Sequence, residues 1–197
     1  VVAPSLEDLG QLGELLAQTH LKLAPLANHL RRQPPLSEQV NSWHQDLLGS
    51  SEAARLAPLY DFFQARFDQI DAEYASLPQA VLHGDYSWRN LKRRGDEWAV
   101  IDFERLVVDI PWRELGKLWL REVKSTEERQ AFLAGYRKIL PLQEPSSLLD
   151  ACLSFQLAQG IYRYVLKVDD WEFRQMADEV IEDVQAWCVS QGLDMSN

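Results

Sequence analysis

Residues 81–104 read VLHGDYSWRNLKRRGDEWAVIDFE, and they hold the most informative side chains of the chain. The short apolar run Ala80–Leu82 at their start predicts a buried strand. Further on, residues 91–101 have the pattern of a β-hairpin, with its turn at Arg94–Asp96. The second strand of this hairpin ends on Asp102. We therefore expect a strand, a polar loop and a hairpin in succession.

This pattern places three polar side chains at the ends of adjacent strands: Asp85, Asn90 and Asp102. Carboxylate and amide oxygens suit Mg²⁺, a hard cation that proteins usually hold with one or two carboxylates and the phosphates of a substrate. The alternative is a plain hairpin whose Asp and Asn residues only cap turns. Several such elements in a fixed order and spacing favour the metal site.

The motifs resemble those of a known superfamily. His83–Asp85, four residues, Asn90 and then a strand ending in Ile101–Glu104 resemble the aminoglycoside phosphotransferase and choline kinase superfamily, small-molecule kinases built like protein kinases. The block Asp109–Gly116, DIPWRELG, is similar to that family's Gly-Asp-Pro-x-x-Asp-Leu-Ala. The resemblance proper covers residues 81–120.

The resemblance implies a role for each motif residue. Protein kinases have His-Arg-Asp-x-x-x-x-Asn, in which the Asp accepts the proton of the substrate hydroxyl and the Asn binds metal. By this match Asp85 is the catalytic base, and Asn90 and Asp102 are the Mg²⁺ ligands. His83 and Glu114 are expected to support the site, although Glu114 stands where the family usually has Asp. The implied reaction moves the γ-phosphoryl group of ATP to a hydroxyl of a small molecule, with Mg²⁺.

Substrate recognition is less determined than the reaction. Family members that bind cationic substrates use acidic side chains of their C-terminal helices. The candidates here are Asp169, Asp170 and Glu172 beside the aromatic Trp171, which could attract a cation. Glu104 is a further weak candidate. An exposed helix start whose acids favour the helix dipole explains the same cluster and is the better interpretation.

Charge and composition exclude several function classes. The 197 residues contain 20 Lys and Arg and 30 Asp and Glu, which gives a net charge of −10. This acidic charge argues against a nucleic-acid partner, because phosphate backbones need a basic surface. It is compatible with a small-molecule substrate, including a cationic one. No apolar run has the length of a membrane span and the 197 residues contain no basic-then-apolar leader pattern, so we expect a cytoplasmic protein without a membrane partner. Cys152 and Cys188 are expected to be buried free thiols. Nothing in the sequence indicates the oligomeric state.

Helical periodicity surrounds the central stretch. We expect helices from Ser5 to about Leu23, from Ser37 to about Leu48, over Ala54–Ser76, from Pro111, from Thr126, from Ser146 or Ser147, and from about Trp171 to Ser190. The fold class is α+β, mostly α: the C-terminal helical lobe of a protein-kinase-like fold with a small β-hairpin at the catalytic site. We expect one domain over 1–197, with helices in 1–78, the catalytic loop and metal-binding hairpin in 79–104, and C-terminal helices in 105–197.

Kinases of this type also have an N-terminal lobe of strands, with a phosphate-covering loop and a Lys that pairs with the nucleotide. No Gly-rich loop or Val-Ala-x-Lys strand precedes His83, and the early Lys22 lies in a helical pattern. We therefore expect that this nucleotide-binding lobe is absent from the 197 residues, and that they are inactive alone.

Three alternatives to an antibiotic kinase follow. One is a metabolic kinase. Another is a non-catalytic kinase-like binding or scaffold protein, including the spore-coat type, which the residues after Ile101 also resemble. The last is a Mg²⁺-dependent phosphohydrolase that uses Asp85 differently. Retention of Asp85, Asn90 and Asp102 together favours a kinase, because a non-catalytic protein has no need for all three.

Overall fold

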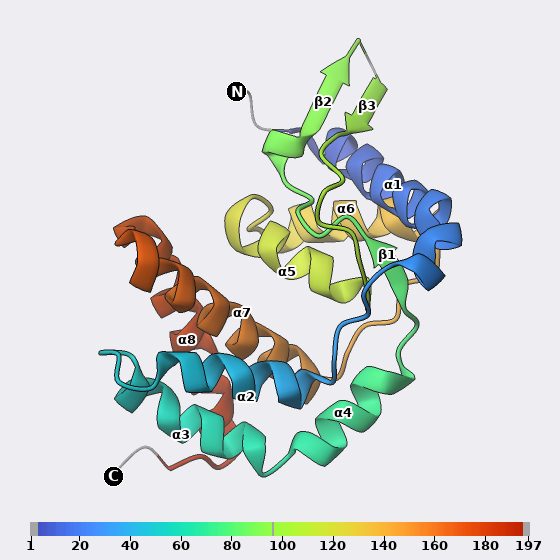
Figure 1. Ribbon diagram of the computed structural model, residues 1–197. Coiled ribbons are helices and arrows are strands. Elements are labelled where there is room, and N and C mark those ends of the chain that lie inside the picture. Colours follow the sequence, from blue (N-terminus) through green and yellow to red (C-terminus); the bar gives the residue numbers. More distant parts are fainter. Residues whose placement is uncertain (1–3, 96, 195–197) are drawn as a thin grey trace. The chain divides into compact units, whose positions relative to one another are not determined.

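The computed structural model describes residues 4–95 and 97–194 (Figure 1). Contacts within the chain divide it into two compact units. The first contains Val1–Gln33 and Pro78–Glu144, and the second contains Pro34–Leu77 and Pro145–Asn197. The single lobe expected over residues 1–197 stays a prediction.

The first unit contains the stretch 81–104 and the helices around it. Its elements are α1 (Leu6–Leu23), η1 (Ala24–His29), β1 (Ala80–Leu82), η2 (Trp88–Asn90), β2 (Leu91–Arg94), β3 (Glu97–Val100), β4 (Val107–Asp109), α5 (Trp112–Arg121) and α6 (Thr126–Arg137).

Local side chains set the starts of two of these helices. The Ser5 hydroxyl accepts the N–H of Asp8 at 3.1 Å, and the Asp8 carboxylate accepts the N–H of Ser5 at 3.0 Å. Ser125 and Glu128 repeat this arrangement before α6. Such capping boxes satisfy N–H groups that the first helical turn leaves without partners. The predicted starts of α1 and α6 are confirmed.

The strands form two separate antiparallel pairs. β2 and β3 make the predicted hairpin, with Leu91 opposite Val100. Asp96, in the predicted hairpin turn, lies outside the described residues. β1 instead pairs with β4, with Val81 opposite Val108. The sequence did not predict this second pair.

The prediction that Asp85, Asn90 and Asp102 end adjacent strands is wrong, because β1 and the hairpin belong to different sheets. The chain turns sharply after β1 at Gly84, whose φ of 82° lies in the left-handed region that favours glycine. The 3₁₀ turn η2 then leads directly into β2. Asp85 and Asn90 therefore lie on one irregular loop, and Asp102 follows β3.

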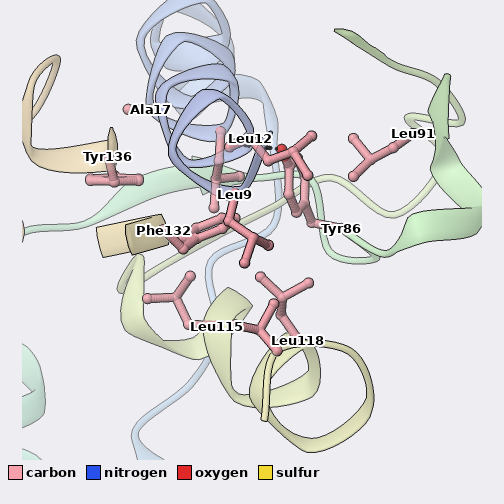
Figure 2. Close-up of a cluster of buried hydrophobic side chains, with 11 residues drawn as sticks. Leu9, Leu12, Ala17, Tyr86, Leu91, Leu115, Leu118, Phe132 and Tyr136 are labelled. Carbon is pink, nitrogen blue, oxygen red and sulfur yellow. Dashed lines mark hydrogen bonds between the residues drawn. The ribbon is translucent and has the colours of Figure 1, made fainter. Parts of the chain in front are cut away.

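Figure 2 shows the apolar core of the first unit, where side chains of α1, α5 and α6 meet residues of the central stretch. Its buried members are Leu9, Leu12, Leu16, Ala17, Tyr86, Leu91, Leu115, Leu118, Val123, Phe132 and Tyr136. The phenol of Tyr86 donates to the carbonyl of Leu12 at 2.7 Å. Burial raises the pKa of Tyr86 well above its usual value, so the phenol remains a neutral donor. Because Tyr86 follows Asp85 in the chain, this contact fixes the loop on α1.

The second unit is helical. Its elements are α2 (Leu36–Leu47), α3 (Ala53–Gln64), α4 (Phe67–Ser76), α7 (Ser147–Val168) and α8 (Trp171–Ser190). Cys152 and Cys188 are buried and free, as predicted, and burial raises the pKa of the Cys188 thiol to about 11. The predicted cap Ser37 is wrong, since it lies inside α2 and donates its hydroxyl to Asp71.

The single helix predicted over Ala54–Ser76 is wrong, because the chain breaks between α3 and α4. Arg66 leaves the helical region of the backbone, with φ −124° and ψ 6°. Its guanidinium donates to the carbonyl of Phe62 at 2.7 Å and lies over the Phe62 ring, 3.7 Å from the centroid. The apolar spacing continues across this break, so periodicity alone could not reveal it.

The fold class is the predicted one, a mostly helical α+β chain with a small hairpin. Among the helices of the described residues, none has both the length and the apolar character that crossing a membrane requires.

Helices α1 and α6 pack closely through glycines. A methyl group on Gly13 would collide with the carbonyl oxygen of Phe132 and would lie 2.9 Å from the backbone nitrogen of Tyr136. A methyl group on Gly10, one turn earlier in α1, would meet the carbonyl oxygen of Ala131 at 3.7 Å, an ordinary contact. The two glycines of α1 therefore differ in how much space surrounds them.

We predict that Gly13→Ala lowers the free energy of unfolding by about 2–3 kcal/mol, because the colliding atoms belong to backbone and helices must move apart. The melting temperature should fall by roughly 4–12 °C in a thermal melt. The control is Gly10→Ala, which should leave stability unchanged or raise it by up to about 1 kcal/mol, since alanine is the better helix former. Equal melting temperatures for the two variants would contradict the close approach of α1 and α6.

Candidate active site

The loop after β1 is held by a buried carboxylate of α5. Glu114 accepts the backbone N–H of His83 at 2.9 Å on one oxygen and that of Gly84 at 2.6 Å on the other. The first of these oxygens also accepts from the ring of His20 at 3.1 Å, and the other ring nitrogen of His20 is hydrogen-bonded to the Tyr136 hydroxyl at 2.9 Å. The side chains of His20 and Glu114 are 0% and 1% exposed. This network connects the loop to α1, α5 and α6.

His83 connects the loop to the chain just after the hairpin. Its ring is fully buried, and Nε2 donates to the carbonyl of Ile101 at 2.9 Å, while Nδ1 accepts the N–H of Asp85 at 3.3 Å. The ring also packs edge-on against Phe103, with centroids 5.0 Å apart. Asp102 is therefore flanked on both sides by residues that contact His83. The supporting roles predicted for His83 and Glu114 remain proposals.

Asp85 follows Gly84 in the loop, and its carboxylate is mostly buried. Its side chain is 11% exposed, and Arg89 forms an ion pair with it. Burial favours the neutral acid, but the hydrogen bond and charge of Arg89, with the charges of Arg105 and Lys117, hold the pKa of Asp85 below its ordinary value. Asp85 is therefore ionised at neutral pH.

Asn90 is bonded to Asp85 at two points. Its side-chain nitrogen donates to the backbone carbonyl of Asp85 at 2.9 Å and to the Asp85 carboxylate at 3.3 Å. This fixes the orientation of the amide, and within residues 4–95 and 97–194 its oxygen accepts no hydrogen bond. The backbone carbonyl of Asn90 accepts the N–H of Ile101 at 2.9 Å, which brings Asn90 beside the residue that precedes Asp102.

Asp102 has an unusual backbone and an available side chain. Its φ of 67° is in the left-handed region, which Asp and Asn tolerate better than other residues with a Cβ. The residue is exposed, and its carboxylate has no hydrogen bond or ion pair within the part of the chain that the structure describes. Non-glycine residues in this region often mark functional sites.

The donor set of Asn90 and Asp102, one amide oxygen and one carboxylate, fits Mg²⁺. This ion keeps several waters and is commonly bound through one or two carboxylates together with substrate phosphates. In the described residues no group of three or more His, Cys, Asp or Glu side chains could hold a metal by itself. A magnesium site here would need ligands from the nucleotide to complete it.

Several residues near Asp85 were missed by the sequence reasoning. Arg89 follows Asp85 by four residues, a spacing at which an ion pair could have been anticipated. Glu122 accepts the N–H of Trp88 at 2.8 Å, and burial raises its pKa. Desolvation by the surrounding protein lowers the pKa of Lys117, although its side chain still reaches solvent. No local pattern could have found Lys117, which lies in α5, or Glu122, which directly follows α5, because both are far from Asp85 along the chain.

The residues predicted to bind a cationic substrate are divided between the two units. Glu104 belongs to the first unit and is 71% exposed, with its nearest cation, Arg105, at 3.8 Å. The other three belong to the second unit. There, Asp170 accepts the N–H groups of Glu172 and Phe173 at 3.1 and 3.2 Å, as the N-cap of α8. These contacts are those of an ordinary helix start, and the substrate role stays a prediction.

A comparison with protein families finds one match. Residues 3–148 match the model of the phosphotransferase enzyme family. The chain belongs to this family. The match confirms the resemblance predicted from the motifs between His83 and Gly116. A search of curated proteins found no significant match.

Solved structures share the fold of this phosphotransferase family member. A choline/ethanolamine kinase family protein from Mesorhizobium loti superposes with a TM-score of 0.64 at 17% identity, over 90% of this chain and 60% of that one. Choline kinase LicA from Streptococcus pneumoniae gives 0.63 at 13% identity, over 92% and 67%. The GDP and kanamycin complex of APH(2")-IIia gives 0.61 at 16% identity, over 94% and 65%. The chain thus spans about 60% of the length of the first of these proteins.

We predict that Glu114→Gln lowers the free energy of unfolding by about 2–3 kcal/mol, because an amide group has only one acceptor oxygen and leaves a buried N–H of the loop without a partner. The melting temperature should fall by roughly 4–12 °C. Amide hydrogen exchange of His83 and Gly84, followed by NMR, should become faster than in the wild type.

The matched control is Glu7→Gln, at an exposed position in the first turn of α1. It removes the same charge and should cost at most about 1 kcal/mol through the helix dipole. If Glu114→Gln left both the melting temperature and the exchange rates as they are in Glu7→Gln, the carboxylate would not be holding the loop.

Proposed function

We propose that this phosphotransferase family member is a small-molecule kinase, which transfers the γ-phosphoryl group of ATP to a hydroxyl group of its acceptor. The observation that carries the proposal is the grouping of Asp85, Asn90 and Asp102 in one unit. Asn90 is bonded to Asp85 through its side chain and to Ile101 through its backbone. An ionised carboxylate and two oxygens of the type that binds Mg²⁺ therefore lie on connected segments.

The chemistry requires alignment and charge neutralisation more than covalent help from the protein. The acceptor oxygen bonds to the γ-phosphorus as the bond from that phosphorus to the β–γ bridging oxygen breaks, and ADP leaves. Asp85 orients the acceptor hydroxyl and takes its proton. Asn90 and Asp102 would hold Mg²⁺, which supplies positive charge against the nucleotide phosphates.

The acceptor we propose is a hydroxyl-bearing small molecule of the aminoglycoside, amino alcohol or sugar alcohol type. This proposal is supported by the similar structures, which include a choline kinase and a complex with kanamycin. Glu104, Asp169, Asp170 and Glu172 remain the candidate contacts for a cationic group on such an acceptor. A nucleotide donor is supported by neighbours solved with GDP, and ATP as that donor by neighbours solved with AMP and with ADP.

Two further observations bear on the setting. A reaction that consumes ATP suits the cytoplasm, and the two free, buried thiols suit a reducing compartment.

The non-catalytic binding or scaffold alternative is not favoured, because the family match and the similar structures are those of phosphotransferases and kinases.

We predict that Asp102→Ala reduces the affinity for Mg²⁺ with ATP by at least about a hundredfold, since even the outer partners of metal ligands are worth ten- to a hundredfold. Calorimetric titration of the full-length protein with ATP, with and without Mg²⁺, measures the change. Asp68→Ala, at an exposed position of α4, is the control and should bind as the wild type does. Unchanged binding by Asp102→Ala would remove Asp102 from the metal site.

We predict that Asp85→Asn lowers the rate of transfer by about two to four orders of magnitude, the usual effect of losing a general base. The amide keeps the shape of the side chain but removes its charge and its proton acceptor. Nucleotide affinity and melting temperature should barely change, because Asp85 faces the acceptor in the proposed mechanism.

The measurement is a coupled ADP-release assay on the full-length protein over a panel of aminoglycosides, choline-like amines and sugars, beside a thermal melt. Asp68→Asn is the matched control and should retain wild-type rates. If the wild type phosphorylates no member of the panel and Asp85→Asn unfolds the protein, Asp85 is structural and the proposed kinase activity is wrong.

A further inference from the structure

A second carboxylate holds the loop between Asp85 and Asn90, and it comes from the end of α5. Glu122 accepts the backbone N–H of Trp88 at 2.8 Å. Trp88 begins the 3₁₀ turn η2, and Ser87 before it provides no side-chain cap. The first N–H groups of a helical turn have no partner within that turn. Glu122 therefore satisfies an N–H group two residues before Asn90.

The place of Glu122 goes against two local preferences. It directly follows α5, and the C-terminal end of a helix carries a partial negative charge that disfavours a carboxylate. The surrounding protein also buries part of the side chain, and this desolvation raises its pKa. Departures from local rules are expected at functional sites. What Glu122 gains in this position is its contact with Trp88.

The backbone around Glu122 is fixed by the helix end. The N–H groups of Glu122 and Val123 are both bonded to the carbonyl of Leu118, each at 2.9 Å. Val123 is also fully buried in the apolar core of the first unit. The carboxylate of Glu122 therefore reaches the loop from an anchored position.

Two carboxylates at opposite ends of α5 hold the loop on both sides of Asp85. Glu114 binds the two backbone N–H groups that precede Asp85, and Glu122 binds Trp88 after it. The two glutamates are eight residues apart, which is about 12 Å along an α-helix. Asn90 then donates back to the Asp85 carboxylate at 3.3 Å. Because a helix is rigid over two turns, the path of the loop from Asp85 to Asn90 depends on both contacts.

The charge of Glu122 also acts on the residue before Asn90. The hydrogen bond and charge of Asp85 raise the pKa of Arg89, which pairs with it. The charges of Asp102 and Glu122 act on Arg89 in the same direction. Glu122 therefore lies close enough to the candidate site for its charge to act there.

We propose that Glu122 is a positioning residue, which holds η2 so that the side-chain oxygen of Asn90 is placed to bind a metal ion. Its action passes through the backbone of Trp88. The inference rests on the proposed function, because Asn90 matters as a Mg²⁺ ligand only in the kinase. A displacement of about 1 Å in such a site can slow a reaction by about a hundredfold.

The first measurement requires no ligand. NMR of the full-length protein, without nucleotide or Mg²⁺, follows the amide exchange of Trp88 and the side-chain NH₂ signals of Asn90. In Glu122→Ala the Trp88 N–H has no acceptor, so its exchange should become faster by about tenfold, the scale of one lost hydrogen bond. The Asn90 signals should shift. Glu122→Gln keeps an acceptor oxygen, and both readouts should return toward those of the wild type.

The second measurement is functional and is made well below the melting temperature. Calorimetric titration with ATP at several Mg²⁺ concentrations accompanies the coupled ADP-release assay. Glu122→Ala should weaken Mg²⁺-dependent ATP binding and lower kcat by about ten- to a hundredfold each, the range for outer partners of metal ligands. The KM for the acceptor should not change, because Glu122 acts on Asn90. Glu122→Gln should lie between Glu122→Ala and the wild type, since a neutral acceptor makes a weaker hydrogen bond than a charged one.

The control is Glu127→Ala, which removes an exposed carboxylate from the first turn of α6. It should match the wild type in every one of these measurements. The proposal is overturned if Glu122→Ala changes only the melting temperature and leaves Trp88 exchange, the Asn90 signals and the Mg²⁺ dependence as in Glu127→Ala. Equal effects of Glu122→Gln and Glu122→Ala also overturn it, because they assign the effect to charge and not to the contact with Trp88.

Failure of this inference is separable from failure of the proposed function. Equal transfer rates in the wild type and Glu122→Ala remove the positioning role and leave the kinase. If the wild type transfers to no acceptor, while Glu122→Ala shifts the Asn90 signals and weakens Mg²⁺-dependent ATP binding, the kinase is removed and the positioning role stays.

Discussion

The Glu114 carboxylate, which accepts hydrogen bonds from the backbone of His83 and Gly84 and from the ring of His20, determines where the loop after β1 can lie. A carboxylate is costly to bury unless charge-assisted hydrogen bonds replace its hydration, and three donors do so here. The same carboxylate gives a hydrogen-bond acceptor to two backbone N–H groups at a sharp turn, where no helix or strand supplies one. Asp85 is the next residue, so its position follows from this contact.

The charges around Asp85 suit a residue that positions a hydroxyl group. Burial alone would push its pKa toward neutral, where a general base is most effective. Arg89, Arg105 and Lys117 outweigh burial and hold the pKa below the ordinary value, so the carboxylate stays ionised. In the proposed mechanism, so weak a base would contribute through orientation of the acceptor as well as through proton acceptance. Phosphoryl transfer with a loose transition state needs little more, because the hydroxyl loses its proton late.

The segment of Asp102 shows the complementary arrangement, in which a ligand is left free. Two residues hold the backbone of Ile101. The His83 ring donates to its carbonyl, and the backbone carbonyl of Asn90 accepts its N–H. The chain then passes through a left-handed residue and leaves the Asp102 carboxylate exposed. The proposed base is thus paired with Arg89 and Asn90, while no hydrogen bond or ion pair holds the carboxylate of the proposed metal ligand within the described residues. Both residues are aspartates, so the difference between their contacts follows from where the backbone places them.

The sequence by itself determined what depends on neighbours along the chain. Apolar spacing, with Ser5 as the cap of α1 and Thr126 as the start of α6, predicted these two helices. The spacing of Asp85, Asn90 and Asp102 identified the family. Both were predictable because helix starts and a short loop are specified locally. Only the tertiary structure decided the pairing of β1 with β4, the break at Arg66, and the contacts of Glu114 and Arg105 with the loop. His20 and Glu114 are 94 residues apart in the chain, and no periodic pattern records that two such distant groups will satisfy each other once water is excluded.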